Sequence, residues 1–249
     1  MRVITWNVNG VRAREREVLE LVQKHKPDVL CMQEIKSSPE QLPPGLGGLI
    51  GLPELTSFWH GKGGYSGVSV HLRKASFAEP VKFSHPSFDH ETRVVEASCG
   101  AMSFVSMYLP NGGKDFAAKM DFLRALAPWA KAQRERPTIV CGDMNVARTE
   151  MDVHISERNA RTIGQRPDER ELFERFFAEG FVDVGRKLAP DDDALFTWWP
   201  YWANARKKNV GWRLDYVSAT EALAAKACRA EVLRDFGASD HAPVIVDFE

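Results

Sequence analysis

Apolar residues recur at the spacing of an amphipathic helix in three stretches of the chain. Pro27 and Gly180 follow the first and the third stretch, as is typical at helix ends. Pro128 lies inside the second stretch and predicts an interruption there, because proline lacks the backbone N–H that a helix uses. The stretches predict helices at Val11–His25, Asp115–Arg134 and Asp168–Glu179.

Shorter apolar runs outnumber the helical stretches and predict strands. Several successive runs are joined by short turns, which favours antiparallel or mixed sheets over a purely parallel sheet. Two mixed sheets packed face to face, with helices outside, accommodate this order of elements. No linker or repeat divides the chain, so we expect one α/β domain over residues 1–249. The predicted strands are Val3–Val8, Val29–Gln33, Val68–Leu72, Val94–Ala97, Phe104–Leu109, Thr138–Cys141, Leu214–Val217 and Val244–Phe248.

The charge balance bears on the kind of partner that the chain can bind. The 249 residues hold 33 Lys+Arg against 34 Asp+Glu, a formal net charge of −1. This balance excludes a protein that binds nucleic acid through overall positive charge, although a local basic surface remains compatible with it. The apolar share of 44% is too high for a disordered chain.

Hydropathy and cysteine usage predict a cytoplasmic protein without a membrane partner. No apolar run approaches the roughly 20 residues of a membrane span, and the N-terminal segment is already polar at Asn7, unlike a signal peptide. The four cysteines are scattered, and Cys31 and Cys141 lie in apolar runs. Disulfides and a zinc–thiolate site are therefore not expected.

Polar side chains gather where the predicted strands end. Taken singly, an asparagine or aspartate at such a position is usually a turn former. Glu34 and Asp215 are more informative, because a carboxylate within an apolar run needs a metal, a cation or water beside it; a buried ion pair is the alternative. The residues at or beside strand ends are Asn7, Asn9, Glu34, Tyr108, Asn111, Asp143, Asn145, Asp240 and His241, and Asp215 lies inside the run Arg-Leu-Asp-Tyr-Val.

This set of side chains favours one kind of chemistry. It combines several carboxylates, amides and a histidine, with neither a cysteine nor a serine nucleophile. Oxygen ligands of this type suit a hard divalent cation, Mg²⁺ or Mn²⁺, and a water nucleophile.

A second feature is a block rich in tryptophan and basic residues between Phe196 and Arg213. Basic residues interleaved with aromatic ones are typical of contact with a phosphate backbone and of stacking on bases or sugars. A solvated loop above an ordinary aromatic core is the alternative. The four cations are Arg206, Lys207, Lys208 and Arg213, and the four tryptophans are Trp198, Trp199, Trp202 and Trp212.

Seven motifs in order resemble those of the exonuclease III / apurinic-apyrimidinic endonuclease family, with matches running from residue 3 to residue 246. They are Trp-Asn-Val-Asn-Gly-Val-Arg-Ala (6–13), Leu-Cys-Met-Gln-Glu-Ile-Lys (30–36), Gly-Tyr-Ser-Gly-Val (64–68), Tyr-Leu-Pro-Asn-Gly-Gly (108–113), Gly-Asp-Met-Asn-Val-Ala (142–147), Asn-Ala-Arg-Lys-Lys-Asn-Val-Gly-Trp-Arg-Leu-Asp-Tyr (204–216) and Ser-Asp-His-Ala-Pro-Val (239–244).

The resemblance implies a four-layer α/β sandwich and Mg²⁺-dependent hydrolysis of DNA phosphodiesters, 5′ to abasic sites and at 3′ ends. The expected partner is double-stranded DNA with abasic sites or blocked 3′ ends, and the expected state is a monomer. By similarity, Glu34 is the principal metal ligand, with Asn9 and Asp240 nearby. Asn9 departs from some relatives, which carry an aspartate there.

The resemblance also implies roles in catalysis. Asp143 would orient or deprotonate the attacking water, and Asp215 would fix the ring of His241. The scissile phosphate would be held by Asn7, Tyr108, Asn145 and His241.

For DNA binding, the resemblance implies that Trp198, Trp212 and Leu214 wall the pocket for the abasic sugar. Lys114 and Trp202 stand where relatives insert side chains into the grooves. The full expected set is Arg12, Tyr65, Asn111, Lys114, Trp198, Trp202, Arg206, Trp212 and Leu214.

Two other readings compete with this one. A phosphodiesterase of the wider superfamily, such as a non-specific deoxyribonuclease or a phosphate-ester hydrolase, shares the strand-end residues, but the block from Trp198 to Arg213 resembles the abasic-site enzymes. A catalytically silent DNA-binding module is the second, and the presence of every expected catalytic residue argues against it.

Overall fold

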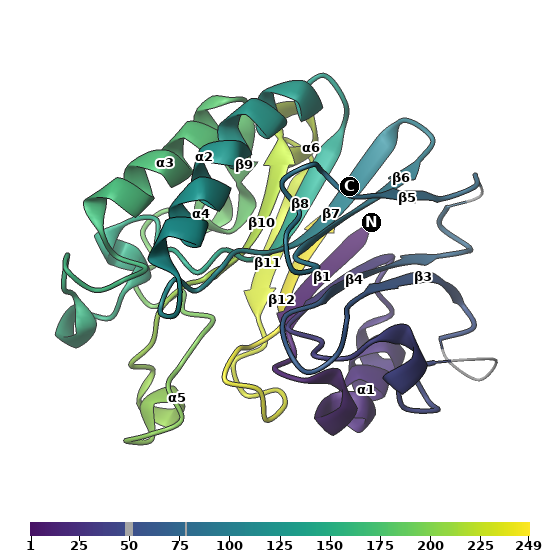
Figure 1. The fold of residues 1–249 in the computed structure, drawn as a ribbon, viewed down its shortest axis with the longest axis horizontal. Coiled ribbons are helices and arrows are strands. Elements are labelled where there is room, and N and C mark those ends of the chain that lie inside the picture. Colours follow the sequence, from purple (N-terminus) through teal and green to yellow (C-terminus); the bar gives the residue numbers. More distant parts are fainter. Residues whose placement is uncertain (48–51, 78) are drawn as a thin grey trace.

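Two mixed six-stranded sheets form the centre of the molecule (Figure 1). The structure is a computed structural model that describes residues 1–47, 52–77 and 79–249. The first sheet has the order β11 (Ala227–Val232), β12 (Val244–Phe248), β1 (Arg2–Asn7), β2 (Val29–Gln33), β4 (Val68–Arg73) and β3 (Leu55–His60). The second has the order β5 (Lys82–Ser84), β6 (Val94–Cys99), β7 (Met102–Tyr108), β8 (Thr138–Asp143), β10 (Asp215–Thr220) and β9 (Phe181–Asp183).

The sheets are mixed because each contains one parallel pair. Strand β1 runs parallel to β2, and β7 parallel to β8, while the other pairs are antiparallel. The expectation of mixed sheets is confirmed.

Helices cover the outer face of each sheet, so the molecule has four layers. Helix α1 (Glu15–His25) packs Val18 and Leu21 against β1 and β2, and the helices α2 (Phe116–Gln133) and α3 (Pro167–Ala178) pack on the second sheet. Both faces of the central strands are therefore covered, which explains why they read as continuous apolar runs. The expected α/β sandwich is confirmed.

The remaining helical segments are short. They are α4 (Val184–Leu188), α5 (Ala205–Lys208), α6 (Glu221–Ala224) and the 3₁₀ turns η1 (Val11–Arg14), η2 (Pro39–Gln41), η3 (Glu150–Asp152) and η4 (Ile155–Glu157).

The predicted interruption at Pro128 is wrong, because α2 runs through it to Gln133. The neighbouring Leu126, Trp129 and Ala130 are buried against the second sheet. Tertiary packing of this face holds the helix together despite the missing hydrogen bond.

Strands β3, β5, β9 and β11 have no counterpart among the predicted strands. All four are edge strands, β11 and β3 in the first sheet and β5 and β9 in the second. Edge strands are only partly covered, so their sequences lack the apolar runs that mark the central strands. Strand β11, for example, exposes Cys228 and Arg229.

The cysteines form no disulfide among the residues that the structure describes. All four cysteines are free thiols, with Cys31, Cys99 and Cys141 buried and Cys228 exposed. Among the described residues, no helix has the length and apolar character that a membrane crossing requires.

Candidate functional site

A cleft of about 870 Å³ lies where strands of both sheets end. In the second sheet, Asp143 at the end of β8 is the register partner of both Tyr108 on β7 and Asp215 on β10. Because β10 is antiparallel to β8, its first residue lies at the same edge as the last residue of β8. The strand-end residues expected to converge therefore do so.

Most of the predicted site residues line this cleft. The lining includes Glu34, Tyr65, Tyr108, Asn111, Lys114, Asp143, Asn145, Trp198, Trp212, Leu214, Asp240 and His241. Three further predicted residues form hydrogen bonds with this lining: Asn7 with Asp143, Asn9 with Asp240, and Asp215 with His241. Within the described part of the chain, Arg12, Trp202 and Arg206 lie outside the lining.

Several of the site residues at strand ends have a left-handed backbone conformation. Asn9, Glu34 and Asn145 have φ of 45°, 51° and 48°. Asparagine tolerates this region, but a residue such as Glu34 adopts it at a cost on the order of 1–3 kcal/mol, which the surrounding fold must supply. Gly142 lets β8 approach β7 closely, since a Cβ there would lie 1.8 Å from the carbonyl oxygen of Met107.

Asp143 is buried at the floor of the cleft, at 1% exposure. Its Oδ2 accepts a hydrogen bond from Nδ2 of Asn7 at 2.9 Å, and its Oδ1 accepts one from the backbone N–H of Asn145 at 2.9 Å. Burial raises the pKa of Asp143 to about 7, against the opposing effect of the His241 charge. The carboxyl can therefore exchange a proton near neutral pH.

His241 forms a buried pair with Asp215. Its Nδ1 lies 2.8 Å from Oδ2 of Asp215, and its Nε2 lies 3.8 Å from Oδ2 of Asp143. Burial alone would lower the pKa of His241, but the Asp215 and Asp143 carboxylates raise it to about 10. The imidazole is therefore a cation at neutral pH, with Nε2 directed towards the cleft floor.

Thr197 completes this pair and was not singled out from the sequence. Its hydroxyl donates to Oδ2 of Asp215 at 2.6 Å and accepts the backbone N–H of Leu214 and Asp215, each at 3.0 Å. Thr197 follows Phe196 in an apolar stretch, where a threonine reads as an ordinary β-former.

Glu34, Asn9 and Asp240 are linked through hydrogen bonds and an ion pair, and Glu34 and Asp240 line the cleft. Nζ of Lys36 lies 2.9 Å from Oε2 of Glu34 and 2.7 Å from Oδ1 of Asn9. Nδ2 of Asn9 donates to Oδ1 of Asp240 at 2.8 Å. Two of the donors thus already converge on a positive charge, and the chemistry of the set fits a hard divalent cation.

Hydrogen bonds fix two further members of this part of the site. Tyr108 donates its hydroxyl to Oε1 of Glu34, and burial together with the Glu34 charge raises the pKa of Tyr108. Nε1 of Trp198 donates to Oδ2 of Asp240 at 3.1 Å. Burial opposes ionisation of Asp240, but the His241 charge and the hydrogen bonds from Asn9 and Trp198 hold the pKa of Asp240 below its usual value.

Trp198, Trp212 and Leu214 form one wall of the cleft. The two indole rings pack edge to face, with centroids 5.6 Å apart and planes at 74°. Leu214 is 6% exposed and contacts the same cluster. The rings and the leucine side chain give this wall an apolar surface.

Arg93 supports Tyr65 and Tyr108 in the lining of the cleft and was missed in the sequence. It is 2% exposed, lies over the rings of Tyr108 and Tyr65 at 4.8 Å and 5.4 Å, and donates to the Tyr65 hydroxyl at 2.8 Å. Nζ of Lys114 lies 6.0 Å from the Tyr65 ring centre. An arginine directly before the strand Val94–Cys99 was the available signal.

The four basic residues from Arg206 to Arg213 do not all face solvent. Arg213 is 2% exposed and pairs with Asp152 and Asp183, both at 2.7 Å. Arg206 donates to the carbonyls of Arg234 and Ser239, each at 2.6 Å, and so holds the loop before β12. The reason is that a guanidinium satisfies several buried carbonyls or carboxylates at once, which its position in the sequence does not disclose.

The other two basic residues of the block, together with Trp202 and Arg12, face solvent. Lys207 and Lys208 are exposed on α5, and Trp202 is 72% exposed. Arg12 is exposed on η1.

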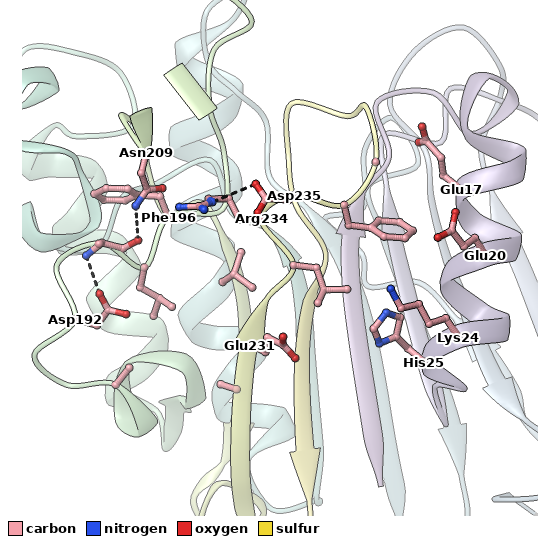
Figure 2. A pocket seen from close by; sticks show the side chains of 18 residues that line it. Glu17, Glu20, Lys24, His25, Asp192, Phe196, Asn209, Glu231, Arg234 and Asp235 are labelled. Carbon is pink, nitrogen blue, oxygen red and sulfur yellow. Dashed lines mark hydrogen bonds and ion pairs between the residues drawn. The ribbon is translucent and has the colours of Figure 1, made fainter. Parts of the chain in front are cut away.

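A second hollow, of about 860 Å³, lies between α1 and β11. Figure 2 shows Glu17 and Glu20 on α1 facing Glu231 and Asp235 across it, with Lys24, His25 and Arg234 as the basic members. The acidic side chains outnumber the basic ones, so this hollow disfavours a polyanion. The strand-end cleft remains the candidate for phosphate chemistry.

Comparison with known proteins gives consistent matches over almost the whole chain. The Endonuclease/Exonuclease/phosphatase family matches residues 4–241. The DNA repair nuclease APEX1 of Danio rerio is 34% identical over 253 residues, which cover 98% of this chain and 81% of that protein. The exodeoxyribonuclease of Bacillus subtilis (strain 168) is 32% identical over 252 residues, 98% of both chains. The structure of an AP endonuclease from Archaeoglobus fulgidus superposes with a TM-score of 0.88 at 26% identity, covering 100% of this chain and 99% of that one.

Proposed function

The chain belongs to the Endonuclease/Exonuclease/phosphatase family, and on this premise we propose that it is a DNA repair nuclease. The proposed reaction is hydrolysis of the phosphodiester 5′ to abasic sites, with 3′–5′ exonuclease and 3′-end-cleaning activity. Relatives named as a DNA repair nuclease and an exodeoxyribonuclease, and the similar AP endonuclease structure, support it. Its substrate is double-stranded DNA with abasic sites or blocked 3′ ends.

The observation that carries the proposal is the pairing of two buried ionisable groups on the cleft floor. Asp143, with its pKa raised to about 7, is suited to accept a proton from the attacking water. His241, held as a cation by Asp215, is suited to bind a non-bridging phosphate oxygen. Asn7, Tyr108 and Asn145 surround the same point and would position the phosphate.

The family is metal-dependent, and we assign the cation to Glu34, Asn9 and Asp240. Mg²⁺ is the expected ion, with Mn²⁺ as a substitute, because the donors are carboxylate and amide oxygens. When bound, it would supply positive charge that stabilises the developing charge on the phosphate oxygens. Lys36, between Glu34 and Asn9, would keep the donors oriented.

We further propose that residues 1–249 act as one domain and as a monomer in the cytoplasm. The family match over residues 4–241 and the single core between the two sheets support the first point. Light scattering coupled to gel filtration tests whether the protein is a monomer.

The proposed function is tested with a duplex oligonucleotide that carries one abasic analogue. We expect incision 5′ to the analogue with Mg²⁺, no incision in excess chelator, and a loss of orders of magnitude for Glu34→Ala. Glu171→Ala, on the exposed face of α3, is the control. Full activity in chelator would contradict the metal assignment, and equal cleavage of intact duplex would favour a non-specific phosphodiesterase.

A further inference from the structure

The loop of residues 234–241 carries two members of the proposed site. It lies between β11 and β12 and bears Asp240, the proposed ligand of the cation, and His241, which is proposed to bind the phosphate. The hydrogen-bond ladder between the two strands ends at the pair Val232–Val244, before the loop begins. The position of Asp240 and His241 therefore depends on contacts that the loop makes with the rest of the protein.

One guanidinium bonds to the backbone of this loop along most of its length. Nε of Arg206 donates one hydrogen bond, and Nη1 and Nη2 donate two each. A guanidinium has five N–H groups, so all of them are used on this loop. The acceptors are the carbonyls of Arg234 at 2.6 Å, Phe236 at 3.2 Å, Gly237 at 3.5 Å, Ser239 at 2.6 Å and His241 at 3.4 Å.

This geometry distinguishes Arg206 from its neighbours on α5. Arg206 is half-buried and lies outside the cleft lining, whereas Lys207 and Lys208 are exposed. A DNA phosphate could bond to Arg206 only by displacing carbonyls of the loop, because each N–H group already has an acceptor. The contacts of Arg206 therefore favour a role within the protein rather than on DNA.

A buried indole holds the guanidinium in place. Cζ of Arg206 lies 5.0 Å from the ring centre of Trp199, which is a cation–π distance. Trp199 is buried, and its Nε1 donates to Oδ1 of Asn209 at 3.1 Å. Its backbone N–H donates to the carbonyl of Asp240 at 3.0 Å. Trp199 thus contacts both the guanidinium and the backbone of the proposed metal ligand.

Other contacts attach single points of the loop to the first sheet and to α1. Nε1 of Trp6 donates to the carbonyl of His241 at 3.2 Å, and Oγ of Ser239 donates to the carbonyl of Asn7 at 2.7 Å. The backbone N–H of Ala238 donates to Oε1 of Glu17 at 3.2 Å. Each of these groups bonds to one residue of the loop, whereas Arg206 connects carbonyls from residue 234 to residue 241.

The spread of these acceptors requires an arginine. The donors of a guanidinium are distributed over three nitrogens in a planar fork, while a lysine has its three donors on one nitrogen. A lysine at position 206 would keep the positive charge but could not reach carbonyls along the whole loop. The carbonyls left without a partner would turn towards water, and the loop would lose its fixed shape.

We propose that Arg206 is a positioning residue, which holds the loop 234–241 so that Asp240 and His241 face the cleft. The catalytic consequence rests on the proposed nuclease function and deepens it, because it gives α5 a part in the reaction as well as in DNA binding. Substitution of Arg206 leaves Lys207 and Lys208 in place on the same helix. The reaction rate should therefore fall while the affinity for DNA is retained.

The first experiment follows the loop by hydrogen exchange and mass spectrometry, without DNA or metal. Arg206→Lys keeps the charge and Arg206→Gln removes it, and both lose the fork. The loop amides that are hydrogen-bonded in the structure, those of Phe236, Ala238 and His241, should exchange about tenfold faster or more in both variants. Arg234→Lys is the matched control on the same loop, because its side chain is 46% exposed, and it should exchange like the wild type.

The second experiment separates rate from affinity on the abasic duplex. The single-turnover rate at saturating DNA should fall about 10–100-fold in both Arg206 variants, which is the usual effect of losing a group that orients the ligands of a metal site. The Kd for the duplex and the dependence of log K on log salt should stay as in the wild type. A phosphate contact would behave differently: Arg206→Gln would lower that slope by about 1, and Arg206→Lys would restore it.

Two results would overturn the proposal. One is unchanged exchange of the loop in both Arg206 variants, and the other is a loss of DNA affinity in Arg206→Gln that Arg206→Lys restores. If Arg206→Gln unfolds, Arg206→Lys decides the question, because it retains the charge and an alkyl stem beside Trp199. A wild-type protein that cleaves no duplex would refute the nuclease function alone, since the exchange experiment requires neither DNA nor cleavage.

Discussion

At the scale of single residues, burial determines the charge state of the groups proposed to act on phosphate. Asp143 and His241 lie side by side, yet burial raises the pKa of Asp143 to about 7 while neighbouring carboxylates raise that of His241 to about 10. Between these values the pair consists of a base and a cation, which is the combination that phosphodiester hydrolysis requires.

Asp143→Asn should lower the cleavage rate by roughly 10²–10⁴, the usual effect of removing a general base. DNA binding should persist or tighten, because a negative charge near phosphate is lost. A base acts when deprotonated, so the wild-type rate should rise with pH through about 7, and this rise should be absent in the variant. Single-turnover rates over pH and a binding titration check both points. A parallel loss of rate and binding would instead indicate a structural role.

Asp215 and His241 should behave as a unit in a double-mutant cycle. Once Asp215→Asn has removed the carboxylate that orients and charges the ring, His241→Ala should cost little more. The measurement is kcat/KM for both single variants and the double variant. Lys207→Ala, remote from the pair, should add independently to Asp215→Asn. Additive losses for Asp215 and His241 would show that they do not act together.

Trp212→Ala tests whether the aromatic wall selects the substrate. An abasic sugar can leave the duplex without breaking a base pair, and a pocket narrowed by two indoles would admit it and exclude a complete nucleotide. The variant should lose activity at abasic sites and gain cleavage at intact nucleotides. The ratio of the two rates, measured together with the melting temperature, checks this. A lower melting temperature with an unchanged ratio would mean that Trp212 is only core.

At the scale of elements, a buried ion pair connects two helices to the ends of the catalytic strands. Lys119 on α2 and Glu169 on α3 are both fully buried, 2.5 Å apart. Nζ of Lys119 also donates to the carbonyls of Asn111 and Asn145, at 3.2 Å and 2.8 Å. The second Glu169 oxygen accepts the backbone N–H of Gly164 at 2.8 Å. The pair therefore positions three loops that border the cleft.

Lys119→Met should destabilise the fold by about 3–5 kcal/mol, because it leaves the Glu169 carboxylate buried without a partner. The double variant Lys119→Met/Glu169→Gln should be more stable than Lys119→Met, since no uncompensated charge remains. Denaturant unfolding of the three proteins is the measurement. Arg175→Met, whose partner Glu171 is exposed, is the matched control and should change stability little. Equal stability of Lys119→Met and the wild type would refute the assignment.

At the scale of the whole molecule, the distribution of charge matters more than its sum. The net charge is only −1, and the hollow beside α1 is acidic. Attraction for a DNA backbone therefore depends on local positive groups, and we propose Lys207 and Lys208 for this role. Both are exposed on α5, which projects from the body of the molecule in Figure 1.

Lys207→Ala and Lys208→Ala should each weaken DNA binding regardless of sequence and reduce the dependence of log K on log salt by about 1, because each removes one phosphate contact. Binding titrations at several salt concentrations measure this slope. Lys131→Ala, at the end of α2, should leave it unchanged. A slope that does not differ among the three variants would exclude α5 from the DNA contact.

The apolar pattern and the ordered motifs were enough to predict the central strands, the main helices and the four layers. These elements are covered on both faces or along one face, so each carries its burial in its own sequence. The same pattern put Asn7 and Asp143 at strand ends, Asp215 inside an apolar run and His241 before the last strand. The fold brings the four into one buried network.

Only the tertiary structure decided what lies across from each residue. The edge strands lack an apolar pattern because one of their sides has no neighbouring strand, and the continuity of α2 through Pro128 depends on the sheet beneath it. Arg213 lies in a run of basic residues, yet Asp152 and Asp183 come from distant segments to neutralise it. Likewise, His60 and Asp89 meet only because two sheet edges pack together. The hydrophobic pattern of the sequence indicates which side chains are buried. The charge state of a buried side chain depends on partners that are distant in the sequence and that only the fold brings next to it.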